Sequence, residues 1–234
     1  MRRKGKLFVV SGPSGVGKGT ICKELLCKYP DIKLSISATT RQPRKGEIDG
    51  ESYFFKTREE FMEMVRTGKM LEYAEVYGNF YGTPMDRILD VVDGGENMIL
   101  EIEMDGAMQV KKKYPEAIFV FILPPSLDVL LERITGRGTE SRESIATRTS
   151  AAIDEMERIH DYDYFIVNET VEESVRHLKF IMDYNHQNHE KAGADGELSQ
   201  KRVLEKMSVH NNGYISIDAL LERIKGGSNV TTID

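Results

Sequence analysis

A glycine-rich segment near the amino terminus has the residue types and spacing of a phosphate-binding loop. It reads Gly12-Pro13-Ser14-Gly15-Val16-Gly17-Lys18-Gly19-Thr20, after the apolar run Leu7–Val10 and before a helical pattern. Glycines let the backbone curl so that its N–H groups point at phosphate oxygens, and the N-terminus of the helix adds positive potential. Because Lys18 can reach the β- and γ-phosphates of a nucleotide, the segment predicts a P-loop rather than a turn that only links strand to helix.

The loop departs from the strict P-loop pattern at one position. That pattern has Ser or Thr directly after the lysine as a magnesium ligand, whereas here Gly19 follows the lysine and Thr20 comes one residue later. We therefore expect Mg²⁺ to be held through water and the nucleotide phosphates, and we assign it no direct protein ligand. Since GTPases, ATPases and small-molecule kinases share such loops, the acceptor must be inferred from other residues.

Two arginines beside several hydroxyls form a second candidate phosphate site. Arg41 and Arg44 stand three residues apart in the segment that runs from Ser37 to Arg44. Arginine recognises phosphate through two parallel N–H bonds in one plane. Further polar side chains of the same region are Tyr53, Glu72, Tyr81 and Thr83.

The order of these motifs resembles that of the guanylate kinase family, from about residue 4 to residue 187. The matching motifs also include Pro124-Pro125-Ser126, Arg133, Arg137-Gly138-Thr139-Glu140, Arg148 and Val167-Asn168. The resemblance implies transfer of the γ-phosphoryl group of ATP to GMP, with Mg²⁺ accompanying ATP. It also implies three parts: a core over residues 4–34 and 84–187, a GMP-binding insertion over 35–83, and a mobile lid over about 135–148.

The resemblance further implies roles for individual residues. The GMP phosphate would be gripped by Arg41, Arg44, Tyr53 and Tyr81, and guanine would be read by Ser37, Glu72 and Thr83. ATP would be bound by the loop residues Gly12 to Thr20 together with Arg133, Arg137 and Asn168. The transferring phosphoryl group would be stabilised by Lys18, Arg41, Arg137 and Arg148.

The guanine role of Glu72 also has a physical basis. Guanine presents an N1–H and an exocyclic N2–H₂ group side by side, and one carboxylate can accept both hydrogen bonds. Adenine has an acceptor at N1 and no amino group at C2, so it would leave the carboxylate unpaired, and sites of this type reject the wrong partner strongly. Taken outside the motif series, Glu72 would instead be read as a solvated acid at the end of a helix.

Two glutamates follow the apolar run Met98–Leu100, where the family has aspartates. Glu101 and Glu103 keep the charge but place the carboxylate roughly 1.5 Å further along the side chain. We include both in the GMP-binding set and expect Glu103 to contact guanine or the water shell of magnesium. For Glu101 a structural role is an equal alternative.

The elements around the motifs predict an α/β fold with a parallel-sheet core. Four continuous apolar runs predict strands buried on both faces, at Leu7–Val10, Met98–Leu100, 117–123 and Tyr164–Val167, and helical patterns separate them. Apolar residues at every second position from Ile32 to Ala38, followed by turns, predict a small mixed or antiparallel insertion. A short helix should follow, with Thr57 and Glu60 as its capping box.

Composition and charge indicate which partners and which cellular compartment to expect. The chain has 234 residues, and 32 basic against 38 acidic residues give a net charge of −6, which argues against non-specific nucleic-acid binding. Two cysteines make no disulfide framework, and no apolar run is long enough for a secretion signal or a membrane span, so we expect a cytoplasmic protein that does not bind membranes. Residues 188–234 are predicted to be a linker and a mainly helical appendage of unknown role. The oligomeric state stays open.

Two other functions compete with GMP phosphorylation. A related P-loop kinase would act on another acceptor, but Glu72 and Thr83 favour guanine. A kinase-like scaffold would bind phosphopeptides through Arg41, Arg44 and Tyr53, but such modules typically have a degraded phosphate loop, and this chain retains Lys18.

Overall fold

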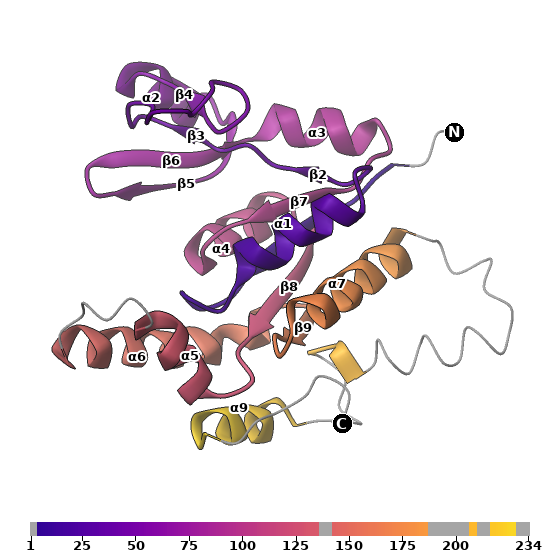
Figure 1. The fold of residues 1–234 in the computed structure, drawn as a ribbon. Helices are drawn as coiled ribbons and strands as arrows, with labels where there is room; N and C mark the ends of the chain where they lie inside the picture. Colours follow the sequence, from indigo (N-terminus) through magenta and orange to yellow (C-terminus); the bar gives the residue numbers. More distant parts are fainter. Residues whose placement is uncertain (1–3, 136–141, 187–205, 210–215, 228–234) are drawn as a thin grey trace, which may run out of the picture. The chain divides into compact units, whose positions relative to one another are not determined.

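The computed structural model describes residues 4–135, 142–186, 206–209 and 216–227 (Figure 1). Contacts between residues divide the chain into two compact units. The first unit comprises Met1–Val9 and Pro30–Ala117, and the second comprises Val10–Tyr29 and Ile118–Asp234. Within the described ranges, no helix is long and apolar enough to cross a membrane.

The first unit contains one side of the parallel sheet. Strand β1 (Leu7–Ser11) begins in this unit and lies next to β7 (Met98–Glu101), which pairs in parallel with β2 (Lys33–Leu34). All five residues of β1 are buried, as expected for a strand covered on both faces. The predicted parallel core is confirmed here.

A second, mixed sheet occupies the rest of the first unit, in the order β4-β3-β6-β5. Its strands are β3 (Ala38–Thr39), β4 (Phe54–Phe55), β5 (Met70–Val76) and β6 (Asn79–Pro84). Strand β3 pairs in parallel with β4 and antiparallel with β6, and β6 pairs antiparallel with β5. The mixed character of the insertion is therefore confirmed.

The alternating stretch from Ile32 to Ala38 is not one strand. Backbone bonds from Lys33 N to Asn97 O and from Ser35 N to Ile99 O hold β2 to β7, while β3 belongs to the second sheet. An alternating pattern shows that a strand is half-buried but does not identify its partner, so the pattern concealed the change of sheet.

Three helices complete the part of the first unit that the structure describes. They are α2 (Arg58–Arg66), α3 (Met85–Asp93) and α4 (Met104–Lys113). The predicted capping box is confirmed, because Thr57 Oγ1 accepts from Glu60 N at 3.1 Å and Glu60 Oε2 accepts from Thr57 N at 2.8 Å. Helix α2 covers one face of the second sheet, where Phe61 and Phe80 stack in a shared apolar cluster.

The second unit contains the end of β1, β8 (Ile118–Leu123) and β9 (Tyr164–Val167), with β8 between the other two. Helix α1 (Lys18–Lys28) packs beside α7 (Val171–His186) (Figure 1). The remaining elements before residue 186 are α5 (Leu127–Thr135), α6 (Arg142–Glu157) and the 3-10 helix η1 (Arg158–Asp161).

The predicted carboxyl-terminal appendage contains helix α9 (Ile217–Lys225), which Ser216 caps and Gly226 ends. Its apolar face, from Ile217 to Ile224, is buried, and it packs on α6. The predicted linker after residue 187 lies outside the described residues.

Candidate functional site

The phosphate loop lies in the second unit, between β1 and α1. A Cβ atom at Gly12 would lie 2.3 Å from the carbonyl oxygen of Ile122, so no side chain fits there. Gly17 has φ +103° and is the N-cap residue of α1, and a Cβ at this position would lie 2.6 Å from Asn168 Nδ2. The strand, loop and helix that the sequence predicts are thus in place, with Lys18 as the first residue of the helix.

Side chains from distant parts of the second unit hold the loop backbone. Val16 O accepts hydrogen bonds from Asn168 Nδ2 at 2.7 Å and from Arg133 Nη1 at 3.2 Å. Arg133 Nη2 also donates to Asn168 O at 3.1 Å, and Ser174 Oγ donates to Asn168 Oδ1 at 2.9 Å. Desolvation against the loop lowers the pKa of Arg133. The structure thus brings Arg133 and Asn168 to the loop.

The inner part of the loop presents cationic and N–H groups. Lys18 is only 8% exposed, and its Nζ donates to Gly12 O at 2.6 Å and to Pro13 O at 3.4 Å. Ser14 N points at Glu155 Oε2, 3.4 Å away, so a loop N–H already faces an anionic oxygen. Gly19 and Thr20 are exposed in the first turn of α1. Such a loop can bind phosphate through its backbone.

The predicted acceptor residues lie in the first unit, on the face of the second sheet opposite α2. Glu72 pairs with Thr83 across β5 and β6, and Thr39 pairs with Tyr81 across β3 and β6. Continuing that register by one residue places Ser37 opposite Thr83. Because side chains alternate between the faces of a sheet, Ser37, Tyr81 and Thr83 share the face of Glu72.

Glu72 is a buried carboxylate with a defined partner. Its side chain is only 6% exposed, and Thr83 Oγ1 donates to its Oε1 at 2.6 Å. Burial raises the pKa of Glu72, while the hydrogen bond from Thr83 and the charge of Lys113 oppose that rise. The solvated acid considered from the sequence is therefore excluded, and the position can distinguish a ligand that donates from one that does not.

An arginine and two tyrosines form the other part of this face. Arg41 lies 5.4 Å from the ring centroid of Tyr53, and the rings of Tyr53 and Tyr81 meet edge to face with centroids 6.1 Å apart. Both terminal nitrogens of Arg41 bond to Glu47, at 3.0 and 2.8 Å, and Arg44 N donates to Glu47 Oε2 at 2.6 Å. The Glu47 carboxylate is the main cause that raises the pKa of Arg41, and Tyr81 contributes less.

Comparison with known proteins shows to which family the chain belongs. A family model described as guanylate kinase matches residues 4–185. The chain belongs to the guanylate kinase family. It is 55% identical over 180 residues to a guanylate kinase of Clostridioides difficile, covering 77% of this chain and 88% of that one. It is 44% identical over 205 residues to a guanylate kinase of Oceanobacillus iheyensis, covering 88% of this chain and 98% of that one.

A solved structure agrees with this family membership. The crystal structure of guanylate kinase from Anaplasma phagocytophilum is 33% identical, with a TM-score of 0.63, and the match covers 86% of this chain and 96% of that chain. The α/β fold with a parallel core and a second mixed sheet is therefore the guanylate kinase fold.

The structure does not test the roles that the guanylate kinase resemblance implies for Glu101, Glu103, Arg137 and Arg148. Glu101 ends β7, and Glu103 is the exposed N-cap residue of α4. Arg148 belongs to α6, in a part of the helix whose side chains are outside the description, and Arg137 lies outside the described residues altogether. Their roles, and the lid itself, stay predictions.

Glu47 contacts the arginine of the candidate acceptor site but was not singled out from the sequence. Both terminal nitrogens of Arg41 bond to the carboxylate of Glu47, and the pKa of Glu47 is lowered chiefly by that arginine and then by the N–H of Arg44. Its spacing of three from Arg44 was the available signal, because a carboxylate three residues ahead can accept from a backbone N–H in a turn.

Proposed function

We propose that this chain transfers the γ-phosphoryl group of ATP to GMP, giving ADP and GDP. Membership of the guanylate kinase family supports the reaction, and the buried Glu72–Thr83 pair is the single observation that supports the choice of acceptor. The phosphate loop accounts for the donor. The donor and acceptor sites belong to different units.

The donor site would bind the phosphates of ATP through the loop backbone and the ammonium group of Lys18. Arg133 and Asn168 would keep Val16 and its neighbours in the curled conformation through their hydrogen bonds to Val16 O. The same two residues would also contact ATP. A loop whose backbone is held in advance needs no reordering when the anion arrives, which favours tight and oriented binding.

Magnesium would enter with ATP rather than occupy a protein cage. No group of three or more His, Cys, Asp or Glu suited to a metal occurs among the residues the structure describes. The residues present fit an ion held through water and the nucleotide phosphates, because Gly19 and Thr20 at the start of α1 are exposed to solvent. When bound, the ion would neutralise charge on the β- and γ-phosphates.

The acceptor site would hold GMP at both ends. Arg41, with Arg44, Tyr53 and Tyr81, would bind the phosphate, and Glu72, with Ser37 and Thr83, would bind the base. Glu72 would accept from the N1–H and N2–H₂ groups of guanine, whereas adenine would leave this buried carboxylate facing a lone pair. Glu101 and Glu103 complete the proposed set at the end of β7 and the start of α4.

The chemical step needs positioning more than a strong base. An oxygen of the GMP phosphate attacks the γ-phosphorus, the bond from that phosphorus to the bridging oxygen breaks, and its electron pair leaves with ADP. Lys18 and Arg41, with Arg137 and Arg148 from the proposed lid, would stabilise the charge on the transferring group.

The direct test is ADP release from ATP with GMP, AMP, UMP or CMP as acceptor. We expect turnover with GMP and at least a hundredfold less with AMP, because a site built to accept hydrogen bonds excludes a base that lacks the donors. Lys18→Met should lower kcat by about 10²–10³-fold. Turnover with none of the four acceptors would refute the kinase assignment in favour of a binding module, and equal turnover with AMP would refute the role of Glu72.

A further inference from the structure

Helix α4 contacts the exposed edge of the second sheet at the strand that carries Glu72. Strand β5 is an edge strand, so its outward backbone groups have no neighbouring strand to pair with. Gln109 supplies that pairing for Tyr73, because its Oε1 accepts from Tyr73 N at 3.2 Å and its Nε2 donates to Tyr73 O at 3.0 Å. The side-chain amide thus replaces the peptide group of an absent strand.

The same helix contacts the residues on both sides of Glu72. Lys113 Nζ donates to Met70 O at 2.8 Å, and the charge of Lys113 lowers the pKa of Glu72 against the effect of burial. Gly106 lies so close that a Cβ atom on it would be 3.0 Å from Glu72 Oε2. Helix α4 therefore contacts the strand before, at and after the carboxylate.

The pairing of β5 with β6 is irregular next to Glu72. The register shifts between Met70 and Glu72, so the ladder to β6 alone does not fix the strand there as firmly as a regular pair would. Recognition of a base edge requires donor–acceptor distances near 2.9 Å, and a shift of a few tenths of an ångström weakens both bonds.

We propose that Gln109 is a positioning residue for guanine recognition, acting through the backbone of Tyr73 on the carboxylate of Glu72. The inference rests on the proposed role of Glu72 in reading guanine. Gln109 holds both backbone groups of the next residue, and Gly106 leaves the space in which the carboxylate lies. The predicted consequence is that changes on α4 alter the choice of base without a contact to the base.

The experiment compares GMP with inosine monophosphate, which has the same phosphate and N1–H but lacks the 2-amino group. The ratio of kcat/KM for GMP to kcat/KM for inosine monophosphate measures the second hydrogen bond to Glu72. Gln109→Met keeps the length and approximate shape of the side chain and removes both hydrogen bonds to Tyr73. We expect this ratio to fall by about fivefold to tenfold, with KM for ATP unchanged.

Lys112→Met is the matched control, because it places the same side chain on the exposed face of the same helix. It should leave the ratio unchanged. Gly106→Ala is a second probe that removes no hydrogen bond and favours the helix, while its methyl group displaces the Glu72 carboxylate. It should lower the ratio even if Gln109→Met proves poorly folded in thermal unfolding.

The double variant Gln109→Met with Glu72→Gln separates the two claims. If Gln109 acts through Glu72, the ratio in the double variant should equal the ratio in Glu72→Gln alone. Additive effects, or an unchanged ratio in both Gln109→Met and Gly106→Ala, would overturn the positioning role while leaving the proposed function intact. An unchanged ratio in Glu72→Gln itself would overturn the guanine role of Glu72 and this inference with it.

Discussion

The phosphate loop and the acceptor face of the second sheet differ in which groups are proposed to contact the anionic ligand. In the loop, the backbone is the proposed ligand-binding surface, and the side chains of Arg133 and Asn168 hold that backbone through Val16 O. On the acceptor face, the backbone forms an ordinary sheet, and the side chains of Arg41 and Glu72 are the proposed contacts. In the loop, side chains support a backbone that is proposed to contact the ligand, whereas on the acceptor face the backbone supports the side chains that are proposed to do so.

This difference predicts different responses to substitution. A backbone site requires glycine wherever a Cβ would collide or φ is positive, so even a methyl group should damage it. A side-chain site depends on charge, reach and burial, so its substitutions should have graded effects that separate base recognition from phosphate binding.

Gly17→Ala should lower kcat/KM for ATP by roughly 10- to 100-fold, because a left-handed backbone and a contact 2.6 Å from Asn168 Nδ2 both oppose the methyl group. Steady-state kinetics with each substrate varied in turn would show the loss on the ATP side. Gly68→Ala is the matched control, since Gly68 also has a positive φ of +70° but no atom within 4 Å of its Cβ position. Equal losses in both variants would mean that strain alone, and not the loop, is responsible.

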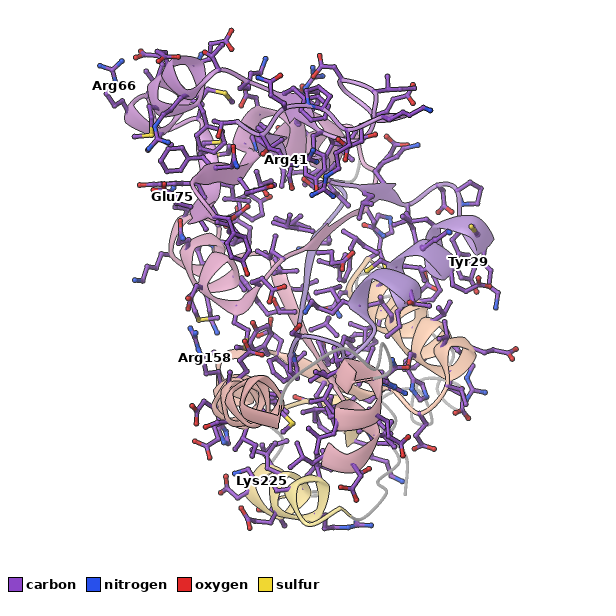
Figure 2. All side chains as sticks on the ribbon, turned by 60° about the vertical axis from the view of Figure 1, so that its left-hand side comes forward. Tyr29, Arg41, Arg66, Glu75, Arg158 and Lys225 are labelled. Atoms are coloured by element: carbon purple, nitrogen blue, oxygen red, sulfur yellow. The ribbon has the colours of Figure 1, made fainter. Side chains whose placement is uncertain are left out.

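Arg41→Lys should raise KM for GMP about tenfold and leave KM for ATP unchanged. Lysine keeps the charge but cannot form the two parallel bonds that Arg41 makes to Glu47 and is proposed to make to phosphate. Arg66→Lys makes the same change on the outer end of α2, where Arg66 pairs with Glu63 at the surface (Figure 2). A normal KM for GMP in Arg41→Lys would contradict the phosphate role of that arginine.

Acid should weaken GMP use before it weakens ATP binding. Burial raises the pKa of Glu72 above its ordinary value of 4.5, and only the ionised carboxylate accepts both guanine hydrogen bonds. The kcat/KM for GMP should therefore fall, as pH decreases, with a midpoint above 4.5, and the residual activity of Glu72→Gln should lack this step. A wild-type profile with no step above 4.5 would contradict the prediction.

Protonation of Glu72 should also affect the stability of the protein, but in the opposite direction from its effect on GMP use. A raised pKa means that the folded state binds the proton more tightly than the unfolded state, so the stabilisation is complete below pH 4.5 and is lost as pH rises through the folded pKa. The free energy of unfolding of the wild type, relative to Glu72→Gln, should therefore decrease as pH rises above 4.5 and through the raised pKa of Glu72. Denaturant unfolding at several pH values measures it.

Lys225→Met should change stability by less than about 1 kcal/mol and change neither KM. Lys225 lies on α9 (Figure 2), and its 2.9 Å ion pair with Glu157 is at the surface, where such pairs contribute little. Ile224→Ala, on the buried face of the same helix, should instead destabilise the protein by about 2–4 kcal/mol. A change of base preference in either variant would show that the appendage influences the acceptor site.

Local chemistry explains which parts of the fold were predictable. The strands at the apolar runs and the capping box of Thr57 and Glu60 depend on residues close in sequence, and both are confirmed. The change of sheet between β2 and β3 depends on which distant strand is available, and alternation alone does not specify it.

The candidate sites divide in the same way. The loop was recognisable because glycine spacing, lysine and the following helix are contiguous, and Glu72 and Thr83 were identified through the motif series. Glu47 and Gln109 were not identified, since each acts on a group whose position is set by a turn or by the packing of a helix on a strand edge.

The sequence by itself determined the type of chemistry: a phosphate-binding loop, arginines for a second phosphate and a carboxylate suited to guanine. These properties reside in residue types and short spacings. The tertiary structure alone decided that Glu72 is buried and paired with Thr83, that Asn168 and Arg133 hold the loop, and that Gln109 completes an open sheet edge. Burial and hydrogen-bond pairing are properties of contacts between distant segments, which form only when the chain has folded.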